Sequence, residues 1–500
     1  MSHTGSGKRA DITSTLTYNY TTHHTIIHPS TPLSLKTLDY NYESWLLGMF
    51  PSSHPELFAS YLNTLLQWMG PAATMAQEMC KKFNATCPPT ALYFPCHLAP
   101  WGYQSQDTTI YQHWNLAYAL LPLVTQWTFT HNLTAARLAL PLFEGTTDLL
   151  SSILQKLPSN ATPAGYAYHD ANPLNLDSAG EGPGVPNPQI ALSYFASVAA
   201  AHADMAAALS VPYPPQAMDI ALNMTPYPTY LRPVHNASPS APPNATVWAL
   251  WDTSDTSRAP PLGGPMPIYV GEDLGGLLPI SPQQRAIAQA TVRSGIAGDW
   301  AATGTLFSPV AAVLLSSGCP GKCNSTAFPY AFSPEEVIAG WLSSITQDPS
   351  QNTQGFLGRN GLILALAGIE NIGASRFVTE LLLGSGLLTP APKASWYARL
   401  FPVWPMAQPA AFSGLLSKGG FAWSANYTAN VGVSSPVGVT AQYASGACAA
   451  LNPWPELGRS GVTVTCGGGT PTLTWIDVDE GEVFQWSMTM GQQCTVSANK

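Results

Sequence analysis

The chain has 500 residues, of which 45% are hydrophobic and only 9% are Asp, Glu, Lys or Arg, and its formal net charge is −9. This mildly acidic balance, without any run of Lys and Arg, argues against nucleic-acid binding. No apolar run reaches the about 18 residues that a membrane span needs. The length and hydrophobic content predict a large globular domain with one or more smaller ones.

Asn-X-Ser/Thr sequons are spread along the chain, at Asn19, Asn84, Asn132, Asn160, Asn223, Asn236, Asn244, Asn324 and Asn426. Each must lie on an accessible surface if it carries a glycan. We therefore expect a secreted protein, or one in the lumen of the secretory pathway or vacuole. Residues 1–11 contain no apolar segment typical of a signal peptide, so we expect the C-terminal part of a longer precursor. The alternative is a cytosolic chain with unused sequons.

Eight cysteines fit an oxidising compartment. They fall into groups, with Cys494 apart: Cys319 with Cys323, then Cys80, Cys87 and Cys96, then Cys448 with Cys466. A zinc site is less favoured, because the C-x-x-x-C pair has no second pair of Cys or His at zinc-finger spacing. We expect disulfides, no metal ion and no cofactor.

Hydrophobic periodicity predicts a series of helices after a polar segment over residues 1–35. Asn132 or Thr134, Ser281 and Ser333 stand where they can cap three of them. The predicted helices are Glu56–Cys80, Ile110–Thr130, Leu133–Leu157, Pro188–Leu209, Pro282–Ile296, Pro334–Ile345 and Gly361–Gly384. Long loops are expected over residues 158–188 and 210–282, and such loops often carry binding groups.

Beyond about Leu416 the pattern changes to short β-branched or aromatic runs broken by Gly. These runs are Phe421–Ser424, Val431–Val433, Val437–Tyr443, Val462–Cys466, Leu473–Ile476 and Glu482–Trp486. We expect them to form a small antiparallel β module. The predicted organisation is a polar N-terminal segment over 1–35, a helical domain over 36–410 and a β domain over 411–500.

Four polar clusters interrupt this weakly charged chain. The first two are residues 37–45, with Asp39, Asn41 and Trp45, and residues 101–115, with Asp107, His113 and Trp114. The other two are residues 168–189, with Asp170 and Glu181, and residues 369–375, with Glu370 and Asn371. Each also has an ordinary structural interpretation: a helix cap, a core histidine, a solvated loop with Asx turns, and a carboxylate at a helix N-terminus.

Carboxylates on separate loops, beside aromatic side chains, are what glycoside hydrolysis requires. One carboxyl group protonates the leaving oxygen, and the other activates water or attacks the sugar. A Ser-His-Asp hydrolase is not indicated, because the chain has no G-x-S-x-G elbow. A Walker A motif and a G-x-G-x-x-G motif in a βαβ setting are also absent. The clusters favour an oligosaccharide or polysaccharide as the substrate.

The order of these motifs resembles the catalytic and C-terminal domains of glycoside hydrolase family 95, the inverting α-L-fucosidases, some of which act on α-L-galactosides. Leu38-Asp39-Tyr40-Asn41 is similar to the family's Leu-Asn-Ile-Asn-like stretch, with Asp39 in place of an Asn. Gln106-Asp107-Thr108 with Trp114 resembles its Gly-Asp-Thr segment. Ile369-Glu370-Asn371-Ile372-Gly373 resembles its Ile-Asp-Gly-Asn-Phe-Gly segment, whose Asp helps to activate water. The likeness covers about residues 36–460.

The resemblance implies a mainly α fold, an (α/α)6 barrel of the six-hairpin type followed by a small C-terminal antiparallel β-sandwich. It implies inverting hydrolysis of terminal α-L-fucosyl or α-L-galactosyl linkages, with Glu370 as the base, assisted by Asn41 and Asp39. The side chains expected to bind the sugar are Trp45, Asp107, His113, Trp114 and Asn371.

The general acid departs from the family pattern. The family carries this Glu in a Ser-Pro-Glu-Asn motif, whereas the nearest match here is Asn172-Pro173-Leu174-Asn175, with Leu174 at the Glu position. Glu181 is the favoured substitute, because Asn187-Pro188-Gln189 follows it into the next predicted helix, and Asp170 is the alternative. Two other functions stay open: a glycan-binding relative without catalysis, and a different sugar reaction such as phosphorolysis.

Overall fold

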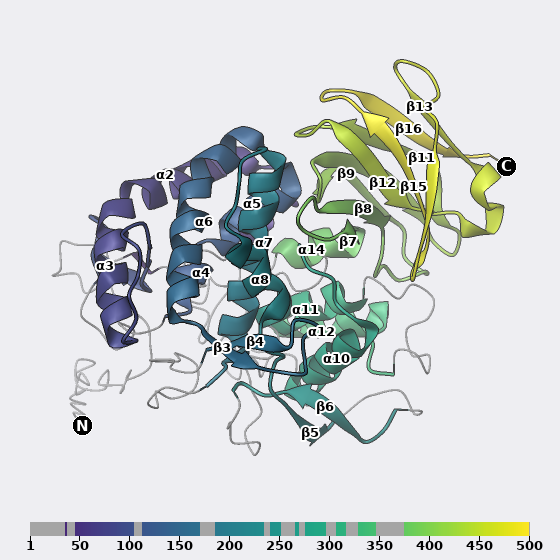
Figure 1. Ribbon diagram of the computed structural model, residues 1–500. Coiled ribbons are helices and arrows are strands. Elements are labelled where there is room, and N and C mark those ends of the chain that lie inside the picture. Colours follow the sequence, from purple (N-terminus) through teal and green to yellow (C-terminus); the bar gives the residue numbers. More distant parts are fainter. Residues whose placement is uncertain are drawn as a thin grey trace, which may run out of the picture.

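The computed structural model describes residues 36–37, 46–104, 113–170, 186–234, 241–251, 266–269, 276–296, 307–316, 329–346 and 375–499. Within these ranges a helical part is followed by two β-sheets, and the two parts lie side by side in Figure 1. One large cluster of buried side chains runs through the helices and extends to Trp396 and Leu416 in the sheets. The helices and the sheets therefore share a continuous hydrophobic core.

The helical part is built from short and medium-length helices. They are η2 (Pro55–Phe58), α2 (Ala59–Gln67), α3 (Met69–Lys82), α4 (Asn115–Tyr118), α5 (Leu121–Thr130), α6 (Leu133–Ile153), α7 (Gln189–Ala208), α8 (Pro215–Asn223), α9 (Met266–Tyr269), α10 (Pro282–Ile296), α11 (Phe307–Ser316), α12 (Pro334–Thr346) and α14 (Ser375–Leu382). Three small sheets accompany them: β1 (Lys36–Thr37) with β2 (His97–Leu98), β3 (Gln155–Pro158) with β4 (Tyr166–His169), and β5 (Thr229–Pro233) with β6 (Asn244–Trp248).

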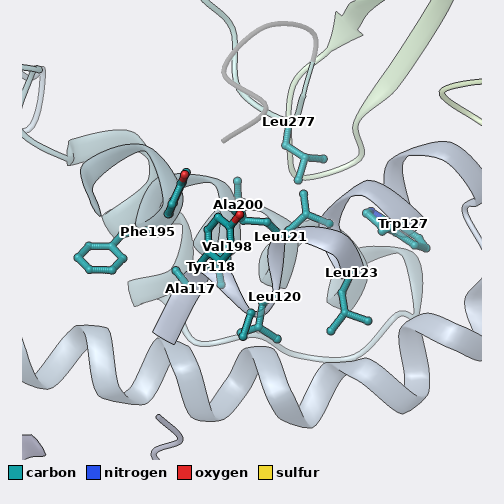
Figure 2. Packing of buried hydrophobic residues seen from close by; sticks show 14 of the residues in the cluster. Ala117, Tyr118, Leu120, Leu121, Leu123, Trp127, Phe195, Val198, Ala200 and Leu277 are labelled. Atoms are coloured by element: carbon teal, nitrogen blue, oxygen red, sulfur yellow. The ribbon is translucent and has the colours of Figure 1, made fainter. Parts of the chain in front are cut away.

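Helix α7 lies at the centre of the helical part. It contacts α4, α5, α6, α8 and α9, and nearly all of its side chains are buried. Figure 2 shows Tyr118 and Leu121, from the α4–α5 region, close to Val198 and Ala200 of α7. Among the described residues, α7 is also the one helix long and apolar enough to cross a membrane, but 89% of its most apolar window is buried inside the fold. Such burial is typical of a core helix.

The predicted helix caps are confirmed. Asn132 accepts hydrogen bonds at Oδ1 from the backbone N–H groups of Thr134 and Ala135, at 2.9 and 3.1 Å. Ser281 Oγ accepts the Gln284 N–H at 3.1 Å, and Gln284 Oε1 accepts the Ser281 N–H at 3.0 Å. The same reciprocal arrangement links Ser333 to the third residue of α12. These capping boxes fix where α10 and α12 begin.

The C-terminal region contains two five-stranded sheets. The first has the order β13-β16-β11-β10-β9 and the second β14-β15-β12-β8-β7. Their strands are β7 (Leu383–Thr389), β8 (Ser395–Leu400), β9 (Ala410–Ser417), β10 (Phe421–Thr428), β11 (Gly432–Ala441), β12 (Gly446–Leu451), β13 (Val462–Cys466), β14 (Thr474–Val478), β15 (Gly481–Met488) and β16 (Gln493–Ala498). Trp423 of the first sheet meets Trp486 of the second edge-to-face, with ring centroids 6.3 Å apart. Side chains from both sheets thus fill one core between them.

The expected mainly α fold, with its (α/α)6 barrel, is wrong. Of the described residues, 41% are helical and 27% lie in strands. Part of the difference comes from β7 and β8, which lie where no strand was expected, and part from β4, β5 and β6, which occupy predicted loops. β3 takes the place of the end of the predicted helix Leu133–Leu157. The four central residues of β8 are all buried. A strand covered on both faces lacks the apolar–polar alternation by which strands are recognised.

Two disulfides join Cys80 to Cys87 and Cys466 to Cys494. The first lies within an expected group of cysteines. In the second, Cys466 bonds to Cys494 and not to Cys448, with which it was grouped in the sequence. The reason is that Cys466 of β13 and Cys494 of β16 lie directly opposite each other in the paired strands. Cys319 and Cys323 lie outside the described residues.

A buried ion pair lies where the helical part meets the second sheet. The Nη2 atom of Arg399 in β8 is 2.6 Å from Oε2 of Glu480, in the turn between β14 and β15. The Tyr397 hydroxyl also donates to Glu480, and Nη2 of Arg285 in α10 lies 3.9 Å from its Oε1. Burial acts to raise the pKa of Glu480, but the charges of Arg399 and Arg285 and the hydrogen bonds from Arg399 and Tyr397 together outweigh it, and the pKa lies below its ordinary value.

Candidate functional site

Most of the predicted site residues lie outside the described part of the chain. These are Asp39, Asn41, Trp45, Asp107, Glu181, Glu370 and Asn371. The structure describes the other three, His113, Trp114 and Asp170, and brings His113 and Asp170 into direct contact.

His113 and Asp170 form a buried hydrogen-bonded pair. Nε2 of His113 is 2.6 Å from Oδ2 of Asp170, and the side chains are 0% and 2% exposed. His113 stands just before α4, and Asp170 directly follows β4. The pair therefore joins the second and third polar clusters across 57 positions of sequence. Burying a polar group costs free energy unless it is hydrogen-bonded. The hydrogen bond between the two side chains therefore allows both to be buried.

Asn187 holds Asp170 from the other side. Its Oδ1 accepts the Asp170 backbone N–H at 2.9 Å, and its own N–H donates to the Asp170 carbonyl at 2.9 Å. Its side-chain amide also lies 3.1 Å from Nδ1 of His169. Asn187 has a φ of +50°, a left-handed conformation that Asn tolerates better than most residues. Asp170 and Asn187 are therefore in contact, and Glu181 lies between them in the sequence.

Aromatic side chains surround the pair. The His113 ring lies 5.7 Å from the Phe83 ring and 6.0 Å from that of Phe195 in α7, centroid to centroid. Trp114 packs edge-on against Tyr118, at 5.5 Å, and is 5% exposed. A carboxylate and an imidazole are therefore held in apolar surroundings, where electrostatic interactions are stronger than in water.

Each side chain of the pair has one further polar atom that makes no hydrogen bond to the described residues. Nδ1 of His113 has no partner among the residues that the structure describes. Within the same ranges the Asp170 side chain makes no hydrogen bond besides the one from His113 to Oδ2, so Oδ1 has none. The arrangement can fix the orientation of a carboxyl group and exchange a proton between Oδ2 and Nε2. Both are abilities that a general acid–base group needs.

A polar cluster that sequence reasoning missed fixes the strand leading to Asp170. Asp219 of α8 accepts hydrogen bonds from the hydroxyls of Tyr166 and Tyr168 in β4, at 2.5 and 2.7 Å. Lys156 of β3 donates to the same carboxylate at 3.1 Å. Burial acts to raise the pKa of Asp219, but these three hydrogen bonds outweigh it and the pKa is lowered. Burial, followed by Asp219, raises the pKa of Tyr168 to about 12. No local sequence signal links residues this far apart.

No group of three or more His, Cys, Asp or Glu side chains suited to a metal ion occurs within the described ranges. His202 of α7, another buried histidine, bonds through Nδ1 to the Thr147 hydroxyl at 2.8 Å. Burial lowers its pKa to about 4, so it is neutral near pH 7. Its role is therefore to fill the α6–α7 interface.

No family profile and no curated protein match this chain. Among solved structures, it is similar to a GH127 β-L-arabinofuranosidase from Geobacillus stearothermophilus T6. The two are 10% identical, the match covers 92% of this chain and 71% of that one, and the TM-score is 0.26. A score this low does not assign a common fold.

Proposed function

We propose that this chain is a glycoside hydrolase whose acid–base group is Asp170, oriented by His113. The observation that carries the proposal is the buried 2.6 Å hydrogen bond between the two side chains, which joins two of the four polar clusters in the sequence. Cleavage of a glycosidic bond requires a proton at the leaving oxygen. With Oδ2 held by His113, Oδ1 is the atom that would give this proton.

The second carboxyl group is proposed to be Glu370, acting as the base. Asn41 and Asp39 would help it to hold the attacking water, by the resemblance of their motifs to those of inverting α-L-fucosidases. Glu181 is the alternative acid, on the segment that begins at Asp170 and ends at Asn187. For an inverting reaction the two carboxyl groups should be about 6.5–9.5 Å apart, which leaves space for the water.

The proposed substrate is a glycan with a terminal α-L-fucosyl or α-L-galactosyl group. Trp45, Asp107 and Asn371 are the proposed sugar-binding side chains. His113 and Trp114 are proposed to act on the sugar indirectly, because both are buried beside Asp170 instead of being exposed to a ligand. The secretory location is also a proposal, supported by the two disulfides and by the exposure of the sequon asparagines of the described residues, with the exception of the buried Asn223.

One observation favours a second candidate, a glycan-binding protein without catalysis. Asp170 is only 2% exposed and its carboxylate is hydrogen-bonded to a buried histidine, as in a purely structural pair. Leu174 also stands where the resembling family has its acidic residue. In this alternative the chain would bind fucosylated glycans and leave them intact.

Hydrolysis of a panel of aryl glycosides separates the two candidates. The panel should include the α-L-fucoside, the α-L-galactoside and the β-L-arabinofuranoside, and NMR of the first product should report its anomeric form. We expect release of the aryl group from the α-L-fucoside with inversion, lost in Glu370→Gln. The control is Glu78→Gln, since Glu78 is exposed on α3. Binding of the fucoside without turnover would favour the second candidate, and turnover of a different glycoside alone would exclude fucose specificity.

A further inference from the structure

A cleft separate from the His113–Asp170 pair lies between α7, α8, β6 and the N-terminal end of α10. Its volume is about 550 Å³. This is within the range of roughly 300–1,000 Å³ that small-molecule sites usually have. In Figure 1, α7 and α8 lie in the middle of the helical part, and α10 and β6 lie below them. Neither His113 nor Asp170 lines the cleft.

The described residues that line the cleft are uncharged. Among them none is an Asp, Glu, Lys, Arg or His. Its polar groups are hydroxyls and amides, including those of Thr225, Thr229, Gln283 and Gln284. A charged ligand would lose its hydration here without gaining an opposite charge, and this loss is costly. The chemistry of the walls therefore selects a neutral ligand.

Aromatic and aliphatic surface forms the rest of the cleft. Tyr227 lines it and meets Trp248 edge-to-face, with ring centroids 5.1 Å apart and an interplanar angle of 84°; Trp248 itself is only 3% exposed. Leu222 lines it as well and is 58% exposed, which is high for a large apolar side chain. Flat apolar surface beside neutral hydrogen-bonding groups matches a sugar ring, which has an apolar face and a rim of hydroxyls.

The walls of the cleft are preformed. The Thr225 backbone N–H donates to the Tyr168 carbonyl at 3.0 Å, and the Trp248 N–H donates to the Thr291 hydroxyl at 2.9 Å. At the N-terminal end of α10, the Gln284 side chain is held through Oε1 by the Ser281 N–H. Its Nε2 makes no hydrogen bond to any residue within the described ranges and can donate to a ligand. A preformed site needs little ordering when it binds.

We propose that this cleft binds a neutral glycan of one or two sugar units, as a site distinct from the Asp170 centre. The proposal does not depend on catalysis, because binding in the cleft and bond cleavage at Asp170 involve different residues. A chain that hydrolyses nothing could still hold a glycan here.

Binding is tested by isothermal titration calorimetry on the full chain with neutral mono- and disaccharides. Sugar concentrations up to about 10 mM allow a dissociation constant near 1 mM to be measured. Gln283→Glu places a negative charge in the cleft, and Gln155→Glu makes the same change on exposed β3. Leu222→Ala is paired with Leu231→Ala, because Leu231 is 75% exposed and does not line the cleft. We expect each cleft variant to weaken binding about fivefold or more, the loss of roughly one interaction, while its control binds as the unaltered chain does.

Turnover of the aryl glycoside, measured on the same samples, should be unchanged in Gln283→Glu, and Asp170→Asn should retain the calorimetric signal. Failure of the proposed hydrolase function would therefore leave this result intact. The proposal is overturned if no neutral sugar binds, if a uronic acid binds as tightly as the neutral sugars, or if Gln283→Glu and Leu222→Ala bind as their controls do. Binding that occurs only after removal of N-glycans would mean that the glycan of the exposed Asn160, next to the cleft residues Ala161 and Thr162, occupies the cleft, and this outcome also supports the proposal.

Discussion

Nε2 of His113 lies 2.6 Å from Oδ2 of Asp170, and neither side chain is more than 2% exposed. The two residues come from segments that a sequence pattern cannot connect, one leading into α4 and the other ending β4. Their contact gives the chain a buried acid–base pair whose carboxylate is further held at its backbone by Asn187.

The first prediction concerns the stability supplied by the pair. His113→Ala leaves the Asp170 carboxylate buried without its donor, and we expect the free energy of unfolding to fall by roughly 1–3 kcal/mol. Urea unfolding followed by circular dichroism measures the change. His54→Ala is the control, since the His54 side chain is 62% exposed and should change stability little. Equal effects of the two substitutions would mean that the His113–Asp170 bond contributes nothing.

A second prediction is that Asp219 makes the free energy of unfolding depend on pH. Its pKa in the folded state lies below the unfolded value, so its contribution is present above the unfolded pKa of about 4 and is lost as pH falls through the folded pKa. Asp219→Asn should therefore reduce the free energy of unfolding at pH 7 and leave a smaller difference from the unaltered chain near pH 3. Denaturant unfolding at both pH values checks this. A difference that is the same at both pH values would contradict it.

Glu480 provides a third prediction, with a close control. Glu480→Gln leaves Arg399 buried and uncompensated, a type of change that costs about 3–5 kcal/mol. Glu482→Gln, two positions on, removes a carboxylate that pairs with Arg459 at 2.7 Å on the surface, where the Arg459 side chain is 46% exposed, and this should cost only about 0–1 kcal/mol. Thermal and denaturant unfolding of the two variants should differ accordingly. If both lose the same stability, the buried pair contributes no more to stability than the surface pair does.

The fourth prediction concerns N-glycosylation in a eukaryotic secretory host. Asn160 and Asn223 form a matched pair, because each triplet is followed directly by a proline. Asn160 is exposed, whereas Asn223 is 8% exposed and its Nδ2 donates to Oδ1 of Asp219 at 2.8 Å. We expect a glycan at Asn160 and none at Asn223, as measured by mass spectrometry of the peptides before and after enzymatic deglycosylation. A glycan at Asn223 would show that α8 is not folded when the chain is modified.

Local features of the fold could be predicted from the sequence, and long-range ones could not. Ser281 and Ser333 were recognisable as caps because a cap depends on the next three residues, and Val462–Cys466 was found with its bounds because its β-branched run ends at a Gly. β8 was missed because its central side chains are buried on both faces and show no alternation. The fold class was therefore wrong. Further along the chain, parts of β10, β11, β13, β14 and β15 were predicted, but β12 and β16 were missed.

The candidate site, too, could be predicted only in part from the sequence. The sequence marked His113 and Asp170 as members of separate polar clusters, but nothing in it indicates that their side chains meet. Asp219, which positions β4, had no signal at all, because its partners Tyr166 and Tyr168 are more than 50 positions away. The roles of Glu370 and Glu181 stay predictions, since both lie outside the described residues.

The measurement that tests the central claim most directly is the rate of aryl α-L-fucoside hydrolysis by Asp170→Asn compared with Glu78→Gln. Asn at position 170 keeps the size of the side chain and the capacity to accept from His113, but it cannot deliver a proton. We predict that turnover falls by roughly 10²–10⁴ in Asp170→Asn, with little change in the folded fraction, and is unchanged in Glu78→Gln. Turnover in Asp170→Asn equal to that of the unaltered chain would contradict the assignment of Asp170 as the acid–base group.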